Sequence, residues 1–323
     1  MKKSLVVFLA PLLLLAAAGN AFAWGNAVHT WLADHTGVRS GYYNFQELYG
    51  ATLPDQYNFL LDANGGFLAL QAHTDVDPVI ENAGTCRLKA VAFGFASHND
   101  LTGADYTAHW GGQTTPGVGY VIAKAEILAP DLVPALAGIL VSAGAGAPEA
   151  QAVAAYLSPT LAHLLVESAV DLRVKSDLDR AIGSRMLVAA QTRSPEVPGL
   201  MAAAYAEGLA AFSGMTLEEA QEYLVAVEHA NRRDIIRYGL AYSGSQGKAL
   251  RYMAGLGVAV ATAYLNAATG YLYDVVVPPE LAVQFLVAAD AVVAADFADE
   301  LRATLAYLRE QMSGIETCRP GTK

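Results

Sequence analysis

Apolar residues recur at helical spacing through most of this chain, and no other feature limits its fold as strongly. The pattern is clearest in four long segments, 159–180, 198–212, 216–243 and 279–312. Ala and Leu are abundant, whereas runs of alternating β-branched residues, which are typical of strands, are few. The sequence therefore predicts an all-α fold.

Local signals predict where two of these helices begin. Thr216 is followed three positions later by Glu219, which is typical of a helix N-cap with its capping glutamate. Pro278 and Pro279 indicate a break and a new start, with Glu280 in the first turn of the last helix. Both signals agree with the helical periodicity that follows them.

Between the helices, stretches at 111–119 and 142–148 that are rich in small and turn-forming residues predict loops. The chain has no internal repeat and no Ser/Gly-rich linker, so we expect one large multi-helix domain. Met253–Tyr273 carries no charge and is long enough for a membrane span. A buried core helix is the favoured interpretation, because fully apolar helices are common inside large helical domains.

The first 23 residues resemble a secretory signal peptide. Lys2 and Lys3 precede an apolar run from Leu5 to Ala18, and small residues stand at the −3 and −1 positions of a cleavage site after Ala23. The apolar run is short for a membrane anchor. We therefore expect an exported protein, periplasmic or extracellular, whose mature chain begins at Trp24.

The chain is acidic, with 20 Lys and Arg against 31 Asp and Glu, a formal charge of −11. Removal of the two signal-peptide lysines gives 18 − 31 = −13. Such a surface disfavours tight binding of a nucleic acid unless bound divalent metals reverse the charge locally. The two cysteines, Cys86 and Cys318, could form a disulfide in an oxidising compartment or remain separate thiols, and the sequence leaves both open.

Histidines and carboxylates occur together at spacings that suit a metal site. His163 and Glu167 are four residues apart in a helical segment, so they share one face. His98, Asp105 and His109 would also share a face if one helix ran through them, although Gly103 argues against this. Neutral imidazoles and carboxylates are ligands that zinc accepts in hydrolytic sites, and no cysteine cluster suggests a structural zinc site.

These residues resemble the zinc-dependent phospholipase C family and its relatives, the single-strand nucleases. Members begin with a Trp whose free α-amine and carbonyl chelate zinc, which Trp24 would match, with His29 five residues later. The family's Pro-Asp motif is similar to Pro54–Asp55, and its next histidine to His73.

Two further stretches, one ending at His98 and one running from Asp105 to His109, resemble the family's central motif. His163 and Glu167 resemble its last motif. The family usually places its Asp four residues after the first His, whereas Asp105 follows by seven. Asp100 is therefore an alternative, although Asp105 keeps the family's spacing to His109.

The resemblance implies three zinc ions per chain in a trinuclear site. It assigns Trp24, His29 and Asp105 to one ion, Asp55, His73, His98 and the bridging Asp105 to the second, and His109, His163 and Glu167 to the third. It further implies a catalytic core at 24–180, with 181–323 as a helical extension of the same domain.

The implied activity is phosphodiester hydrolysis by a metal-activated water that Asp55 orients or deprotonates. Phospholipid is the favoured substrate, with possible peripheral membrane contact, and no protein partner is implied. A single-strand nuclease is the alternative, for which Tyr57, Phe59, Phe67 and Tyr106 could stack bases. A non-catalytic, zinc-stabilised envelope protein is the third interpretation.

Overall fold

The computed structural model describes residues 24–37, 41–58, 60, 62–315 and 318, and the predicted signal peptide lies outside them. Every regular element in this part of the chain is a helix, which confirms the all-α prediction. The elements of the first part are α2 (Asn26–Thr36), α3 (Gly41–Gly50), η1 (Pro54–Tyr57), α4 (Ala63–Thr74), α5 (Asp77–Glu81), α6 (Cys86–His98) and α7 (Ala104–His109). Those of the second part are α8 (Tyr120–Ser142), α9 (Ala147–Arg173), η2 (Val174–Leu178), α10 (Ile182–Thr192), α11 (Val197–Ser213), α12 (Leu217–Tyr242), α13 (Gln246–Ala268), α14 (Pro279–Val293), α15 (Phe297–Gln311) and η3 (Met312–Gly314).

The predicted helix starts are present. At the start of α12, Thr216 Oγ1 accepts a hydrogen bond from the Glu219 backbone N–H at 3.2 Å, and the Glu219 carboxylate accepts one from the Thr216 N–H at 2.8 Å. Helix α14 begins at Pro279, where proline fits because a first-turn N–H has no intrahelical partner anyway. Residues 111–119 lie outside the helices, whereas the second predicted loop is confined to 143–146.

One predicted helix is two helices in the structure. The segment 279–312 divides into α14 and α15, whose axes are bent by 68° across a short break. At this break Asp296 accepts hydrogen bonds from Tyr120 Oη at 2.7 Å and Lys124 Nζ at 2.6 Å, both on α8. The apolar periodicity of the sequence continues through the break. It therefore could not predict the bend, which coincides with a tertiary contact to α8.

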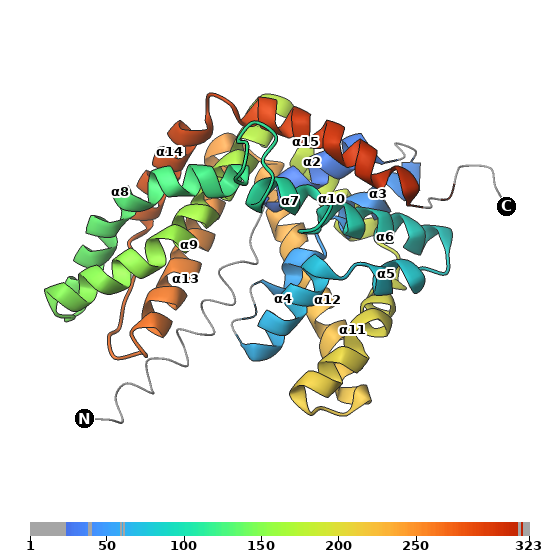
Figure 1. Cartoon of the computed structure of the whole chain (residues 1–323), viewed down its shortest axis with the longest axis horizontal. Helices are drawn as coiled ribbons and strands as arrows, with labels where there is room; N and C mark the ends of the chain where they lie inside the picture. The colour runs from blue at the N-terminus through green and yellow to red at the C-terminus, as the bar shows by residue number, and fades with distance from the viewer. Residues whose placement is uncertain (1–23, 38–40, 59, 61, 316–317, 319–323) are drawn as a thin grey trace.

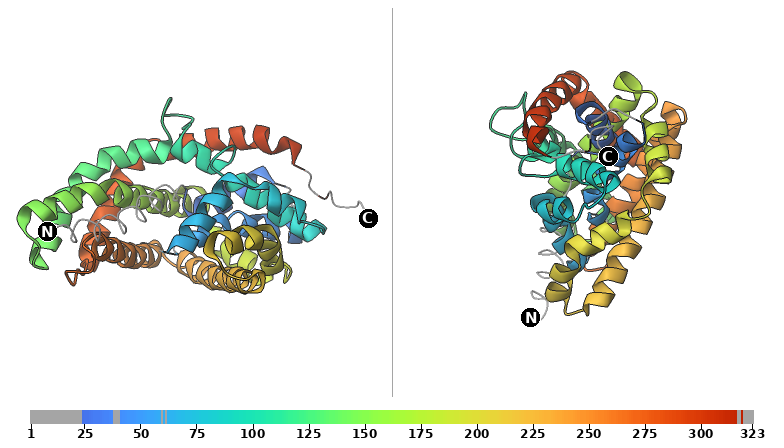
Figure 2. Two further views of the ribbon diagram at one scale, coloured as in Figure 1. Left: turned by 60° about the horizontal axis from the view of Figure 1, so that its bottom comes forward. Right: turned by 90° about the vertical axis from the view of Figure 1, so that its right-hand side faces the viewer.

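Four helices form an elongated arm at one end of the molecule, on the left of Figure 1. Helices α8 and α9 pack as a hairpin, α14 packs on both, and α13 packs on α9 and α14. At the other end α3 packs on α2, α6 and α10. Helices α11 and α12 pack on each other, α11 also contacts α4, and α12 also contacts α10. In the left view of Figure 2, α8 and α15 lie along one side of the molecule, and α12 and α13 lie along the opposite side.

A single cluster of buried apolar side chains extends from Trp24 to Leu308 and joins the two ends. Helix α13 contributes Met253 and Leu265 to it, but residues 255–263 between them are half-buried or exposed, so the helix is less buried than the expected core helix. By length and composition, α8 and the helical stretch Ala147–Leu178 are apolar enough to cross a bilayer, and in this fold they pack against each other.

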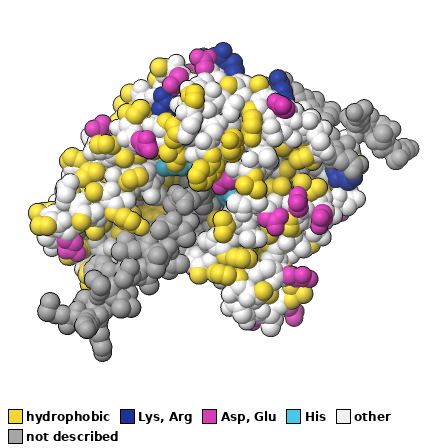
Figure 3. Space-filling view, viewed as in Figure 1, with side chains coloured by type: hydrophobic (Ala, Val, Ile, Leu, Met, Phe, Trp, Pro, Cys, Tyr) yellow, Lys and Arg dark blue, Asp and Glu magenta, His cyan; other side chains and the backbone are white. Residues whose placement is uncertain are grey.

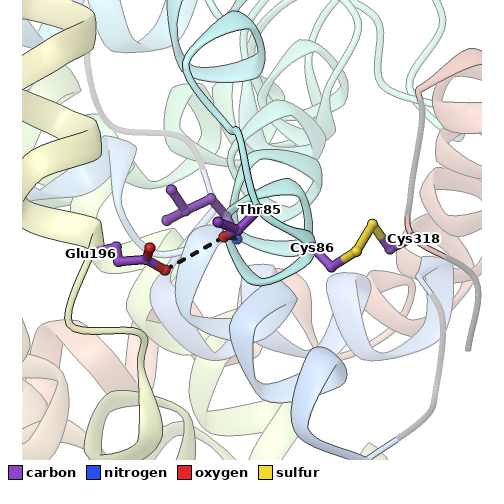
Figure 4. The surroundings of a disulfide bond; sticks show 5 residues. Thr85, Cys86, Glu196 and Cys318 are labelled. Atoms are coloured by element: carbon purple, nitrogen blue, oxygen red, sulfur yellow. Dashed lines mark hydrogen bonds between the residues drawn. A yellow bond between two sulfur atoms is a disulfide. The ribbon is translucent and has the colours of Figure 1, made fainter. Parts of the chain in front are cut away.

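A disulfide joins Cys86, at the start of α6, to Cys318 near the end of the chain, and so settles the open question of the two thiols (Figure 4). Their Cα atoms are 5.4 Å apart although 232 positions separate them in the sequence. Next to the bridge, Thr85 caps α6 by accepting a hydrogen bond from the Leu88 N–H, and its hydroxyl lies 3.5 Å from Glu196. The bond therefore ties the C-terminal segment to the helix that ends at His98.

Candidate metal centre

Five predicted ligands converge where the arm meets the rest of the molecule. His29 lies in the first turns of α2, Asp55 in η1, His73 in the last turn of α4, His98 at the end of α6 and Asp105 in the first turn of α7. All five are buried, and His98 and Asp105 have no exposed surface. Placement at the ends of short elements lets chain segments far apart in sequence direct their polar groups to one point.

Asp105 lies at the centre of this cluster. Its Oδ1 is 3.1 Å from His29 Nε2, and its Oδ2 is 2.9 Å from His98 Nε2 and 3.5 Å from His73 Nε2. Three buried atoms, both Asp105 oxygens and His29 Nε2, make no contact with hydrogen-bond geometry to any described residue. Buried polar atoms that approach closely without hydrogen bonding are expected where an ion is their common partner.

Asp55 completes the cluster on a second side. Its Oδ1 is 3.5 Å from His98 Nε2 and 3.8 Å from His73 Nε2, and it accepts a hydrogen bond of 2.9 Å from Asn58 Nδ2. Two sets of ligand atoms each lie within 4.8 Å of one another: His29 with Asp55 and His98, and His73 with His98 and Asp105. The second set contains three of the four residues predicted for the second ion, whereas the first set shares only His29 with the residues predicted for the first ion.

Backbone carbonyls hold two of the histidines in position. His73 Nδ1 is 2.7 Å from the Ala69 oxygen, and His98 Nδ1 is 2.8 Å from the Ala51 oxygen. Because a carbonyl only accepts, each Nδ1 carries the proton and each Nε2 faces the cluster. This is the usual arrangement of metal-ligating histidine.

The third predicted set lies beside the cluster. On α9, His163 Nε2 is 2.7 Å from Glu167 Oε1, and the His163 ring centroid is 5.2 Å from that of His109. His109 Nδ1 in turn is 2.6 Å from Asp100 Oδ1. Asp105 thus lies in the cluster, whereas Asp100 lies outside it and contacts His109.

The chain path explains the separate roles of the two aspartates. The single helix that would have aligned His98, Asp105 and His109 is absent, because α6 ends at His98 and α7 begins at Ala104. In the intervening turn, a Cβ on Gly103 would lie 2.4 Å from the Asn99 nitrogen. Two helices therefore deliver the motif from different directions.

Trp24 is anchored next to the cluster and is 1 % exposed. Its Nε1 donates to the Ala104 carbonyl at 3.0 Å and lies 3.1 Å from Thr107 Oγ1, so its side chain is attached to the helix that carries Asp105. Its ring also stacks on Tyr120. These contacts place the predicted mature N-terminus at the cluster.

Asp171 is a buried carboxylate that the sequence reading missed. It accepts hydrogen bonds from the backbone N–H groups of Ala27 at 3.1 Å and Val28 at 2.8 Å, and from Tyr238 Oη. A Cβ on Gly25 would lie 2.4 Å from its Oδ2. The signal was available, because Asp171 continues the four-residue series of His163 and Glu167 on α9.

The central pair is strongly coupled electrostatically. Burial alone would raise the pKa of Asp105, but the charges of His98 and His29 outweigh it and hold that pKa well below its usual range. Burial likewise opposes the charged form of His98, yet Asp105 and Asp55 raise its pKa well above the usual value. The cluster therefore favours positive charge facing Asp105.

Negative charge is in excess around the third set. Burial, followed by the charges of Asp55, Asp105 and Asp171, raises the pKa of Glu167 well above its usual range. Burial also raises the pKa of Asp171 to about 7. Within the described residues, no Lys or Arg forms an ion pair with these four carboxylates, so a divalent cation would supply the missing counter-charge.

Other candidate residues lie away from the cluster. His35 packs on Trp31, and His229 is exposed on α12. Arg87 and Lys89 are in the first turn of α6. At a rise of about 1.5 Å per residue they are about 14–17 Å along the helix from His98.

A large pocket opens at the cluster and extends into the arm. Its polar end is formed by Asp55, Glu167 and Asp171 together with Trp24. The rest of the lining comes mainly from apolar side chains of α8, α9, α13 and α14. Figure 3 shows histidine surface near the middle of one face, bordered by hydrophobic side chains.

Comparisons with protein-family models, with curated proteins and with solved structures gave no match. The residues themselves fit zinc. The cluster offers imidazole nitrogens and carboxylate oxygens, which are the donors that catalytic zinc sites use, and it leaves Asp105 and His29 atoms without hydrogen bonds. The donor set, rather than a relative, is thus the basis for considering a metal.

Proposed function

We propose that this chain is an exported zinc-dependent phosphodiesterase of the phospholipase C type. The observation that carries the proposal is the buried convergence of His29, His73 and His98 on the carboxylate of Asp105. Bound zinc ions would neutralise the substrate phosphate and lower the pKa of a water molecule toward neutrality. Trp24 and Asp55, and His109, His163 and Glu167, are the remaining ligands that the family resemblance implies.

Asp55 is the proposed proton acceptor. Although its burial opposes the charged form, His98 and His73 lower its pKa to about 2, so it is ionised at neutral pH. Asn58 holds its Oδ1 by a hydrogen bond, and the side chain borders the pocket. An ionised carboxylate that is fixed at the open side of the cluster is suited to orient a water molecule and take its proton.

The surroundings favour a lipid substrate over a nucleic acid. Tyr57 is fully buried, Phe67 stacks on Phe212 and Tyr106 stacks on Tyr307, so these candidate base-stacking rings are already packed. Phe59 lies outside the described residues. The pocket beside the cluster is mainly apolar, and Arg87 and Lys89 are distant from it.

The test uses the processed protein with Trp24 as its first residue. We expect about three zinc ions per chain by metal analysis, and hydrolysis of bis(p-nitrophenyl) phosphate that stops on chelation and returns with zinc. Zinc without turnover would favour the non-catalytic envelope protein instead. Absence of zinc would exclude the ligand assignment.

With activity established, a panel of phosphatidylcholine and single-stranded DNA decides the substrate class. We expect cleavage of the lipid between glycerol and phosphate, with release of the phosphorylated head group. Faster cleavage of the DNA would favour the single-strand nuclease.

A further inference from the structure

The pocket that opens at the metal cluster has two chemically different ends. Near the cluster it is bordered by Asp55, Glu167 and Asp171. Farther into the arm it is bordered by side chains such as Leu136 of α8 and Phe285 of α14. A ligand that fills both ends must carry a charged or polar group at one end and a long apolar part at the other.

The apolar end has buried side chains on three of its helices, whereas Gly257 and Val260 on α13 are half-buried. Leu132 and Leu136 on α8 and Leu286 on α14 are nearly completely buried, and Leu161 and Leu165 on α9 have at most 9 % exposure, yet all five border the empty volume. Small-molecule sites are typically concave and mainly apolar with a few polar groups, and this pocket has that character.

We propose that this pocket binds one aliphatic chain of the substrate, inserted between α8, α9, α13 and α14 with its polar head at the metal cluster. The position of the head rests on the proposed function, whereas the chain-binding site rests on the apolar lining alone. The occupant is a lipid chain because the four helices supply almost no polar partner beyond the cluster end.

Two glycines on α13 allow a direct test. Gly257 borders the pocket, and a Cβ placed on it would meet no atom within 4 Å. Gly255, two positions earlier on the same helix, is exposed, does not border the pocket and also has open space around its Cβ position. Gly257→Leu therefore puts an isobutyl group into the pocket, while Gly255→Leu puts the same group on the surface.

The experiment measures the binding of two ligand series to the processed protein by calorimetry. Alkylphosphonates with butyl, octyl and dodecyl chains carry a head group that the enzyme cannot remove, because their C–P bond is not a phosphodiester. The corresponding n-alkanols carry no charge and need no metal. In either series, burial of one methylene group of the alkyl chain contributes about 0.8 kcal/mol to the binding free energy, or about fourfold in affinity.

For the wild type and Gly255→Leu we expect affinity to rise about fourfold per added methylene until the pocket is full. For Gly257→Leu we expect the dodecyl compounds to lose at least tenfold in affinity, with butylphosphonate binding unchanged. Hydrolysis of bis(p-nitrophenyl) phosphate, which has no aliphatic chain, should be equal in all three proteins.

Equal chain-length dependence in Gly257→Leu and the wild type would overturn the chain-binding site. Binding of alkanols together with failure to bind any phosphonate would support the chain site and reject the proposed function. Should Gly257→Leu not fold, Val260→Ala enlarges the same pocket, and it should shift the optimum toward longer chains. An unshifted optimum there would also overturn the site.

Discussion

Two adjoining regions of this molecule, the Asp105 cluster and the arm, bury opposite kinds of side chain. Around Asp105, short elements place histidines and carboxylates in the interior with no Lys or Arg paired to them among the described residues. In the arm of α8, α9, α13 and α14, long helices bury almost only aliphatic groups and leave an empty pocket between them. Helix α9 belongs to both, because it carries Glu167 and, two positions earlier, Leu165.

This difference would let the two proposed functions, metal chemistry and chain binding, occupy separate parts of one continuous core. Buried polar groups need exact partners, so their positions depend on defined backbone contacts such as those of His98 with Ala51. An apolar pocket needs only volume and hydrophobicity, so many side chains can form it. Substitutions near Asp105 should therefore affect chemistry, whereas substitutions in the arm should affect chain binding or stability.

The largest expected effect belongs to the proton acceptor. Asp55→Asn keeps the size and an oxygen ligand but removes the charge that accepts a proton. We expect zinc content to remain largely intact while kcat falls by about 10²–10⁴-fold. Steady-state kinetics on bis(p-nitrophenyl) phosphate, with metal analysis of the same sample, measures both quantities.

A matched control is Asp77→Asn, an exposed carboxylate on α5, which should leave kcat unchanged. An Asp55→Asn protein with full zinc and nearly full activity would contradict the assignment of Asp55. It would also weaken the contrast between the two regions, since the carboxylate of the cluster that borders the pocket would then have no chemical role.

Removal of zinc should destabilise one of the two regions more than the other. A ligand present at about 100 times its dissociation constant stabilises the folded state by about 2.7 kcal/mol. Chelation should therefore lower the melting temperature and increase amide hydrogen exchange in α2, α6 and α7. Exchange in α13 should change little, and equal deprotection of α13 would contradict the separation.

Much of the cluster was predictable because each ligand belongs to a short local motif. Pro54–Asp55 and the pair His163 and Glu167 needed only neighbours in sequence. The helical fold was predictable from apolar periodicity for the same reason. The sequence could not show which of Asp105 and Asp100 joins the cluster, because their positions depend on the turn between α6 and α7.

The pocket left no signal in the sequence. Its lining comes from residues as distant as Leu132 and Leu286, and an apolar helix face has the same pattern whether it is packed or borders empty space. The role of Asp171 was hidden for a related reason, since its partners Ala27 and Val28 are backbone groups that any residue provides. Such features depend on tertiary contacts rather than on residue type.

A smaller effect is expected from the link between α9 and the N-terminus. Asp171 accepts hydrogen bonds from the first turn of α2, which carries His29 and follows Trp24, but it is not itself one of the proposed ligands. Asp171→Ala should weaken binding of one zinc ion by about 10–100-fold, as for other outer-shell partners of metal ligands. Competitive titration with a zinc chelator measures this, with the other ions as internal reference.

Tyr238→Phe is the matched control, because it removes only one of the three hydrogen bonds to Asp171. Its effect on zinc binding should be smaller than that of Asp171→Ala. Uniform weakening of all zinc ions in Asp171→Ala would indicate general destabilisation of the fold instead of a positioning role.

The smallest predicted change is in the arm and should not reach the metal centre at all. Tyr271, between α13 and α14, is 75 % exposed and has a φ of 57°, a left-handed conformation that disfavours a side chain. Tyr271→Gly should raise the free energy of unfolding by up to about 1 kcal/mol, whereas Leu272→Gly should lower it by about 0.5–1 kcal/mol. Urea denaturation measures both, and zinc content should be the same in both variants. A loss of stability in Tyr271→Gly would mean that packing of the ring outweighs the backbone conformation, and a loss of zinc would mean that the two regions are coupled after all.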